Sequence, residues 1–200
     1  SKPLEPVAWL IIFLGLTALV VLFGVEKGVE KVSKILMPVL VVLSIFIAVY
    51  AMFIPGALDG VLYYITPDFS KFSVMTVVAA MGQLFYSMSL AMGIMITYGS
   101  YMKKDVSLEN SVHNIEIFDT GIAFFAGLMI IPSVFAFSGG DQSALNAGPG
   151  LMFVTLPKVF NSMPFGEIIG GVFFVLVLFA ALTSSISLME TIVSIVCDKF

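Results

Sequence analysis

The sequence predicts an all-α polytopic membrane protein with five transmembrane helices. Of its 200 residues, 60% are hydrophobic and only 11% charged, and the mean hydropathy is +1.10, whereas an average soluble domain has about 25% charged residues. So few charges cannot solvate the surface of a soluble protein of this size. The apolar residues also gather in stretches near the roughly 20 residues that cross a bilayer. We place the five spans at about 7–24, 35–54, 72–102, 109–140 and 168–196.

The first two spans have the features of ordinary crossings. Residues 7–24 carry no charge, and Pro6 lies in the first turn, where the N–H groups have no intrahelical partner. Residues 35–54 are apolar and are followed by Pro55 and Gly56, which end the helix.

The third span, residues 72–102, is uncharged over 31 positions, which is too long for one straight crossing. Its midpoint is Ser87, and small or polar residues cluster there. This pattern predicts a broken helix, whose unpaired N–H and C=O groups can bind an ion or a zwitterion. Alternatively, Ser and Gly serve close helix packing or bond back to a carbonyl of their own helix.

The fourth span contains a carboxylate. If this helix begins near residues 107–110, Asp119 lies on the order of 15 Å along it. An unpaired carboxylate at that depth costs several kcal/mol and indicates a function. If the helix begins later, Asp119 is interfacial, and the nearby Glu116 favours that alternative. His113 is interpreted as interfacial, because the chain has no second His to share a metal.

The fifth span carries three adjacent hydroxyl residues, Thr183, Ser184 and Ser185, in an otherwise apolar stretch. Consecutive helix residues point in different directions, so these cannot all serve one helix interface. Hydroxyl and carbonyl oxygens suit a hard cation such as Na⁺. The alternative to a cation site is that these hydroxyls serve helix packing.

The linkers suggest an orientation in the plasma or inner membrane. Linkers 25–34 and 103–116 hold most of the lysines, which places them in the cytoplasm. Linker 141–167 is long and contains several turn-forming Gly and Pro residues, so we expect an extracellular lid.

Several classes of function are disfavoured. Nine Lys against 13 acidic residues give a net charge of −4, which offers nucleic acid no basic surface. With one His, one Cys and no phosphate-binding loop, we expect no enzyme, no disulfide and no metal cluster. The opening residues Ser1-Lys2-Pro3 do not have the form of a signal peptide. A channel would need a continuous polar ring, which scattered hydroxyls supply only in an oligomer.

Several longer motifs resemble the neurotransmitter:sodium symporter family in order and spacing, over essentially the whole chain. They are Gly24-Val-Glu-Lys-Gly-Val-Glu-Lys31, Ile65-Thr-Pro-Asp-Phe-Ser-Lys71, Gly82-Gln-Leu-Phe-Tyr-Ser-Met-Ser-Leu90, Ile96-Thr-Tyr-Gly-Ser-Tyr101, Ala126-Gly127 and Phe179-Ala-Ala-Leu-Thr-Ser-Ser-Ile186. The resemblance implies a leucine-transporter-type inverted-repeat fold, with the five spans similar to the fourth to eighth helices. The chain would then be about 40% of a transporter and would pack against the remaining helices of the same protein.

The resemblance also implies two sodium sites, each partly present in this chain. Ser87 is similar to a hydroxyl near the first sodium, and Asp119 stands where the family has an Asn ligand. Ala180, through its carbonyl, together with Thr183 and Ser184, resembles the second site.

The substrate pocket implied by the resemblance is lined by Tyr86, Ser89, Met92, Ser184 and Leu188. Met adapts to varied apolar shapes, so we expect a hydrophobic or aromatic amino acid. Chloride-dependent relatives have a Ser where this chain has Ala123. The carboxylate of Asp119 supplies the negative charge instead, and we therefore expect chloride independence.

Gly28 and Pro38 resemble a Gly-X9-Pro motif at the cytoplasmic start of the family's fifth helix. Unwinding there would admit water and release the second sodium inward. An ordinary first-turn Pro is the alternative.

Together these features predict a sodium-coupled amino-acid symporter that works by alternating access. The alternative is a non-transporting amino-acid sensor or membrane scaffold on the same fold, and a homodimer is left open.

Overall fold

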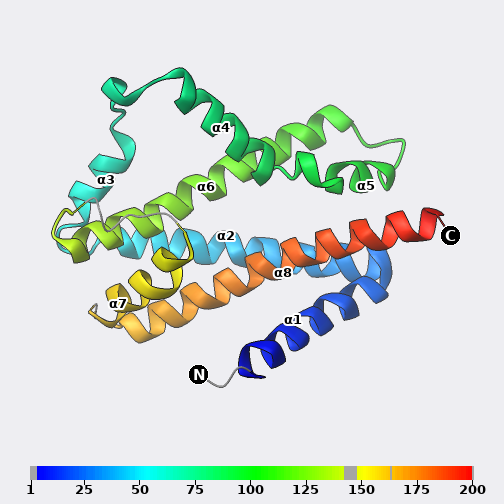
Figure 1. Ribbon diagram of the computed structural model, residues 1–200, viewed down its shortest axis with the longest axis horizontal. Coiled ribbons are helices and arrows are strands. Elements are labelled where there is room, and N and C mark those ends of the chain that lie inside the picture. Colours follow the sequence, from blue (N-terminus) through cyan, green and yellow to red (C-terminus); the bar gives the residue numbers. More distant parts are fainter. Residues whose placement is uncertain (1–3, 142–147, 163, 200) are drawn as a thin grey trace. The chain divides into compact units, whose positions relative to one another are not determined.

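The computed structural model describes residues 4–141, 148–162 and 164–199, and in these ranges every regular element is helical (Figure 1). Two short elements, η1 and η5, are π-helical, and two others, η2 and η3, are 3₁₀-helical. In chain order the elements are α1 (Leu4–Leu22), η1 (Val25–Val29), α2 (Glu30–Met52), α3 (Ala57–Ile65), η2 (Phe69–Lys71), α4 (Val74–Ser87), η3 (Leu90–Met92), α5 (Ile94–Ser100), α6 (Leu108–Ser138), η5 (Leu151–Thr155), α7 (Leu156–Asn161) and α8 (Gly166–Lys199).

Four helices of the described chain, α1, α2, α6 and α8, are long and apolar enough to cross a membrane. They overlap four of the five expected spans, which confirms the all-α membrane fold class. The remaining stretch, 72–102, is divided between α4 and α5, which are separated by the short η3 (Figure 1).

The residues of the expected linker 25–34 are helical, because η1 leads directly into α2. Its residues include good helix formers, and Lys34 pairs with Glu30 one helical turn away. Pro38 is consequently the ninth residue of a continuous α2. The alternative of a first-turn proline is therefore wrong.

The two longer linkers contain helices. Linker 55–71 holds α3 and η2. Of the expected lid 141–167, residues 142–147 and 163 lie outside the described residues, and η5 and α7 occupy 151–161. The α7 residue Phe160 is 5% exposed, and its ring lies 5.3 Å from that of Phe173 on α8. This part of the linker is therefore packed structure, and its role as a lid remains a prediction.

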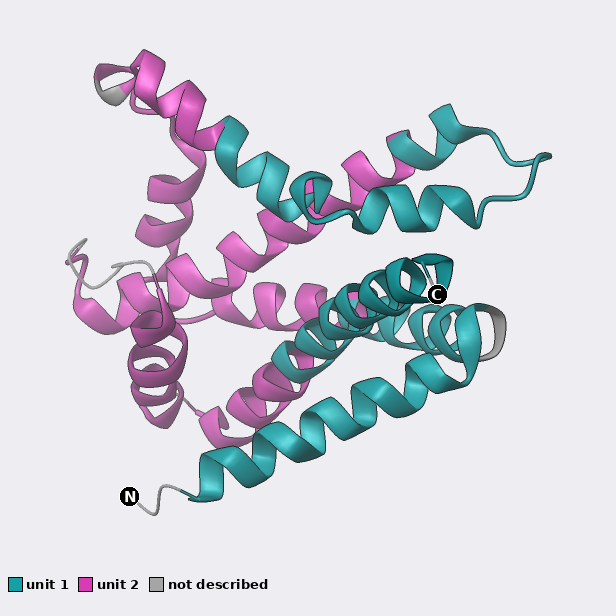
Figure 2. Ribbon diagram, turned by 45° about the vertical axis from the view of Figure 1, so that its right-hand side comes forward, with its two compact units in different colours: residues 1–40, 81–112, 177–200 teal, residues 41–80, 113–176 magenta. Residues whose placement is uncertain are grey.

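The chain divides into two compact units (Figure 2). Unit 1 consists of residues 1–40, 81–112 and 177–200, and unit 2 of residues 41–80 and 113–176. Each is described by itself below.

Unit 1 has a small apolar core of Val21, Val29 and Ile186, contributed by α1, η1 and α8. At the turn between α1 and η1, the backbone at Gly28 packs directly against the backbone at Val20. A Cβ built on Gly28 would lie 2.0 Å from the Val20 carbonyl oxygen, so only glycine fits there.

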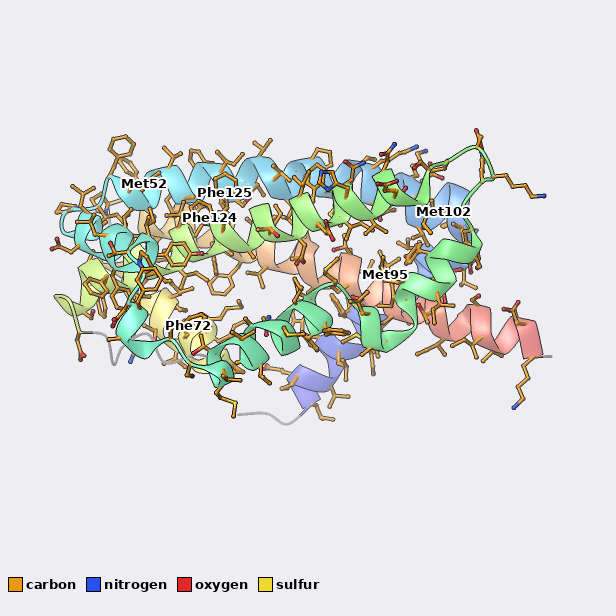
Figure 3. The ribbon with its side chains drawn as sticks, turned by 90° about the horizontal axis from the view of Figure 1, so that it is seen from above. Met52, Phe72, Met95, Met102, Phe124 and Phe125 are labelled. Atoms are coloured by element: carbon orange, nitrogen blue, oxygen red, sulfur yellow. The ribbon has the colours of Figure 1, made fainter. Side chains whose placement is uncertain are left out.

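Unit 2 is packed by apolar and aromatic side chains. Gly60 of α3 lies so close to α6 that a Cβ would come within 2.8 Å of the Pro132 Cα. The ring of Tyr64 lies against Gly127 and 5.7 Å from the ring of Phe124. Figure 3 shows Phe124 and Phe125 on α6. The centres of their rings are 6.2 Å apart.

Candidate functional site

The interruption between α4 and α5 lies at the centre of the third expected span. The regular helical hydrogen bonds of α4 end where Met88 N–H donates to Leu84, and they resume where Thr97 N–H donates to Gly93. In between, Ser89 N–H bonds to Tyr86 and Met92 N–H to Ser89, each three residues back. Ser87 is the last residue of α4, so the predicted break coincides with the polar cluster.

Two left-handed residues produce this break. Gly93 has φ 75°, which glycine adopts at little cost, and Ser89 has φ 56° and ψ 27°. A non-glycine residue in this region costs on the order of 1 kcal/mol. Ser89, one of the predicted substrate residues, is thus held in a strained backbone conformation. Such strain is frequent at ligand sites.

The other predicted pocket residues from this segment lie on either side of Ser89. Tyr86 is 66% exposed near the end of α4, and Met92 is half-buried at the end of η3. Ser184 and Leu188 are exposed on α8 of the same unit.

Two of the predicted sodium ligands are in contact on α8. The buried Thr183 hydroxyl donates to the Ala180 carbonyl at 3.0 Å. Two oxygens at this spacing suit neighbouring positions in a cation's oxygen shell. The next residue, Ser184, is exposed, and Ser185 instead lies 3.1 Å from the buried Thr17 hydroxyl of α1. The three adjacent hydroxyls therefore differ in burial and contacts, and only Ser185 bonds to α1.

Asp119 belongs to unit 2, on α6, where it is half-buried. Because α6 begins at Leu108, Asp119 lies about 16 Å along the helix. This helix start agrees with the deeper of the two expected positions. No cluster of three His, Cys, Asp or Glu side chains able to hold a metal occurs among the described residues.

Two hydrogen bonds that the sequence motifs did not indicate join α8 to α5 and to Tyr101, which directly follows α5. Tyr98 donates to Ser187 at 3.1 Å, and Tyr101 donates to Glu190 at 2.8 Å. Glu190 is only 6% exposed. The spacing is visible in the sequence: Tyr98 and Tyr101 are three positions apart, as are Ser187 and Glu190, and residues three apart share one helix face.

A cavity of about 710 Å³ lies beside this contact in unit 1. It is lined by parts of η1, α2, α5 and α8, and by Met102, which Figure 3 labels beyond the end of α5. Its polar lining comes from Glu30, Ser33, Lys34, Tyr98, Tyr101 and Ser187, and Pro38 also borders it.

Comparison with known proteins identifies the family. Residues 4–200 match the model of the sodium:neurotransmitter symporter family. An uncharacterized sodium-dependent transporter of Bacillus subtilis is 38% identical over 194 residues, which are 97% of this chain and 42% of that protein. The human sodium- and chloride-dependent creatine transporter 1 is 30% identical over 175 residues, which are 82% of this chain and 27% of that protein.

Among solved structures, MhsT in complex with L-phenylalanine matches with a TM-score of 0.80 and 41% identity. The match covers 96% of this chain and 43% of MhsT. The chain thus spans less than half the length of the relatives described here. The family match, the multi-pass helical architecture and the likeness to MhsT agree with one another. This chain therefore belongs to the sodium:neurotransmitter symporter family, a family of membrane transporters rather than enzymes.

Proposed function

We propose that the protein containing this chain is a sodium-coupled secondary transporter of hydrophobic or aromatic amino acids. The observation that carries the proposal is the contact between the Thr183 hydroxyl and the Ala180 carbonyl on α8, in a chain of the sodium:neurotransmitter symporter family. Both oxygens are of the type that Na⁺ prefers.

The geometry of α8 supports a cation site in the following way. Because the Thr183 proton points to the Ala180 carbonyl, the lone pairs of the Thr183 oxygen are directed elsewhere and can face a cation. Ser184 follows directly and contributes a third oxygen. The remaining ligands of this site, which we take as the second of two sodium sites, would come from helices outside this chain. Ser87 and Asp119 would contribute to the first.

The break between α4 and α5 supports a substrate site. Backbone N–H and C=O groups released from the helical pattern can bind the carboxylate and ammonium groups of an amino acid. Tyr86, Ser89 and Met92 border the break, and Ser184 and Leu188 complete the proposed pocket. The side chains of Tyr86, Met92 and Leu188 suit an apolar substrate. MhsT, the structural relative, was solved with L-phenylalanine.

Alternating access would follow from the same interruption. A helix divided at Ser89 and Gly93 can change the direction of one half without unfolding the other. Bound sodium would stabilise the geometry that binds substrate, and its release inward would end the cycle.

Chloride independence is part of the proposal. The negative charge of Asp119 would stand where chloride-dependent relatives bind the anion, and Ala123 one turn later offers no hydroxyl. The human creatine transporter, which is 30% identical, is named as chloride-dependent. Chloride independence of this protein is therefore tested separately. We expect uptake by the intact transporter to continue when gluconate replaces chloride, and loss of uptake would contradict this part alone.

The main experiment measures binding and uptake with the intact protein in proteoliposomes. A panel of radiolabelled amino acids is tested for sodium-dependent binding and then for uptake driven by a sodium gradient. We expect both, with preference for apolar or aromatic members of the panel. Sodium-dependent binding without uptake would instead identify an amino-acid sensor on the same fold. Absence of sodium dependence would overturn the proposal.

A further inference from the structure

Thr17 is the only hydroxyl residue of α1, and its side chain is completely buried. Its oxygen takes part in two hydrogen bonds. The hydroxyl donates its proton to the Phe13 carbonyl at 3.0 Å, one turn back on α1, and its oxygen lies 3.1 Å from the Ser185 hydroxyl oxygen of α8. Because the Thr17 proton is used within α1, Ser185 is the donor between the two helices and Thr17 is the acceptor.

This hydrogen bond fixes the rotation of α8 about its own axis. The residue after Ser185, Ile186, shares a core with Val21, which lies one turn after Thr17 on α1. Two consecutive residues of α8 therefore pack with two residues of α1 that are one turn apart. An apolar contact tolerates a small rotation, whereas a hydrogen bond weakens steeply as its angle departs from linear. The hydrogen bond therefore specifies the rotation of α8 more sharply than the apolar packing does.

The rotation of α8 decides where the candidate sodium ligands point. An α-helix turns by about 100° per residue, so Thr183 projects about 200° away from Ser185, with Ser184 between them. A side-chain oxygen about 5–6 Å from the helix axis moves by about 1 Å when the helix rotates by about 10°. The oxygen ligands of a hard cation keep their distances to it within a few tenths of an ångström. A small rotation of α8 would therefore separate its oxygens from the ligands that other helices supply.

We infer that Thr17 is a positioning residue of the second sodium site. It accepts the hydrogen bond of Ser185 and thereby holds α8 in the rotation that directs the oxygens of Thr183 and Ser184 toward the cation. This inference rests on the proposed function. It adds to that function a residue of α1, a helix that supplies none of the proposed ligands.

The test uses the intact transporter and measures the sodium concentration for half-maximal amino-acid binding. Thr17→Val keeps the branched side-chain shape and removes the hydroxyl. We expect this variant to raise the sodium concentration about two- to tenfold, which corresponds to one hydrogen bond. Affinity for the amino acid at saturating sodium should be unchanged. The conservative variant Thr17→Ser keeps the hydroxyl and should retain the wild-type sodium dependence.

Removal of the donor gives a second measurement of the same bond. Ser185→Ala should raise the half-saturating sodium concentration by a similar factor, about two- to tenfold. The double variant of Thr17→Val with Ser185→Ala should be no worse than the more severe single one, since both changes break the same hydrogen bond.

Two matched variants separate positioning from general stability. Val21→Ala loosens the packing of the same two helices and leaves the hydrogen bond in place. It should lower the temperature of thermal unfolding in detergent at least as much as Thr17→Val does, because it opens a cavity in a buried core. Ser44→Ala removes a buried hydroxyl of unit 2 that bonds to the Val41 carbonyl of its own helix. Both variants should keep the wild-type sodium dependence.

The outcomes separate the inference from the function. An unchanged sodium dependence in Thr17→Val, a shift that Thr17→Ser shares, an additive double variant, or an equal shift in Val21→Ala would overturn the inference while sodium-dependent binding remains. A wild-type protein without sodium-dependent binding would instead overturn the proposed function. If Thr17→Val does not yield folded protein, the comparison of Ser185→Ala with Val21→Ala decides.

Discussion

The two units of this chain bury polar groups in different ways. In unit 1, hydroxyl and carboxylate groups form hydrogen bonds between helices, as in the pairs Thr17–Ser185, Tyr98–Ser187 and Tyr101–Glu190. In unit 2, the buried Ser44 and Ser133 bond to carbonyls of their own helices, and contacts between elements are mainly apolar and aromatic.

This difference predicts that the two units respond differently to substitutions that remove a hydroxyl or add a methyl group. Polar bonds between helices are directional and have discrete alternatives, so they suit parts that bind ions and rearrange. Close packing of rings against glycine and proline tolerates little displacement and suits a scaffold. In the described residues every buried side-chain nitrogen and oxygen atom has a hydrogen-bond partner. Each buried polar side chain described in unit 1 is therefore paired, and removing a partner has a predictable cost.

The largest expected effect comes from Thr183→Val, which keeps the side-chain shape and removes one oxygen of the candidate cation site. A hydrogen bond or contact to a charged group contributes about 1.5–3 kcal/mol, so the half-saturating sodium concentration should rise about 10- to 150-fold. Sodium-dependent amino-acid binding to the intact transporter measures this. Thr191→Val is the matched control, because Thr191 is also buried on α8 and bonds to the Ser187 carbonyl. Equal shifts in both variants would contradict the assignment of the site.

The next prediction addresses the rigidity of unit 2. Gly60→Ala would place a Cβ 2.7 Å from the Phe135 Cβ and 2.8 Å from the Pro132 Cα, neither of which can move alone. We expect a loss of stability of about 3 kcal/mol, near the upper end for overpacking, with sodium affinity unchanged in the protein that remains folded. Thermal unfolding in detergent measures the loss. Gly171→Ala has no atom within 4 Å of the new Cβ and should be neutral or slightly stabilising. A harmless Gly60→Ala would show that unit 2 is looser than described.

A smaller effect is expected from Tyr101→Phe in unit 1. The change removes the donor to the buried Glu190, and an unsatisfied buried acceptor destabilises the fold. Because Tyr101 is 38% exposed, water reaches part of this site, and we expect a loss of about 1–2 kcal/mol in thermal unfolding. Glu190→Gln keeps an acceptor for Tyr101 and should lose less. If Glu190→Gln lost more, the charge rather than the hydrogen bond would be the important property.

The smallest effect is expected from Ser133→Ala in unit 2. Its hydroxyl donates to the Met129 carbonyl one turn back, at 2.8 Å. That carbonyl also accepts the backbone N–H of the same helix, so it stays satisfied without the hydroxyl. Stability should change by no more than about 0.5 kcal/mol. A loss as large as that of Tyr101→Phe would remove the distinction between the two units.

Much of the fold was predictable because hydropathy and helix length are local properties. The start of α6 near residue 108, the break beside Ser87 and the polar cluster on α8 all follow from residues close together in the sequence. The predicted ends of the helices were less accurate than the predicted positions of the spans. The second span was expected to begin near residue 35, yet α2 begins at Glu30, because charged residues with matching spacing also form an exposed first turn.

The contacts between helices were harder to predict. Nothing near Gly28 in the sequence shows that the Val20 carbonyl will lie against it, because the turn between them brings the backbone back on itself. Likewise, nothing near Glu190 in the sequence identifies its hydrogen-bond partner. Its partner, Tyr101, lies 89 positions away, and pairing at that distance depends on how α5 packs along α8.

The sequence by itself determined that this is a polytopic membrane protein of the sodium:neurotransmitter symporter family. Composition, span length and motif order carry that information without reference to distant contacts. The tertiary structure alone decided which polar residues act together. It joined Thr183 to Ala180, turned Ser185 toward α1, and paired Tyr98 of α5 with Ser187 of α8. The physical reason is that a hydrogen bond depends on distances of a few ångströms between helices, which no residue spacing along one helix specifies.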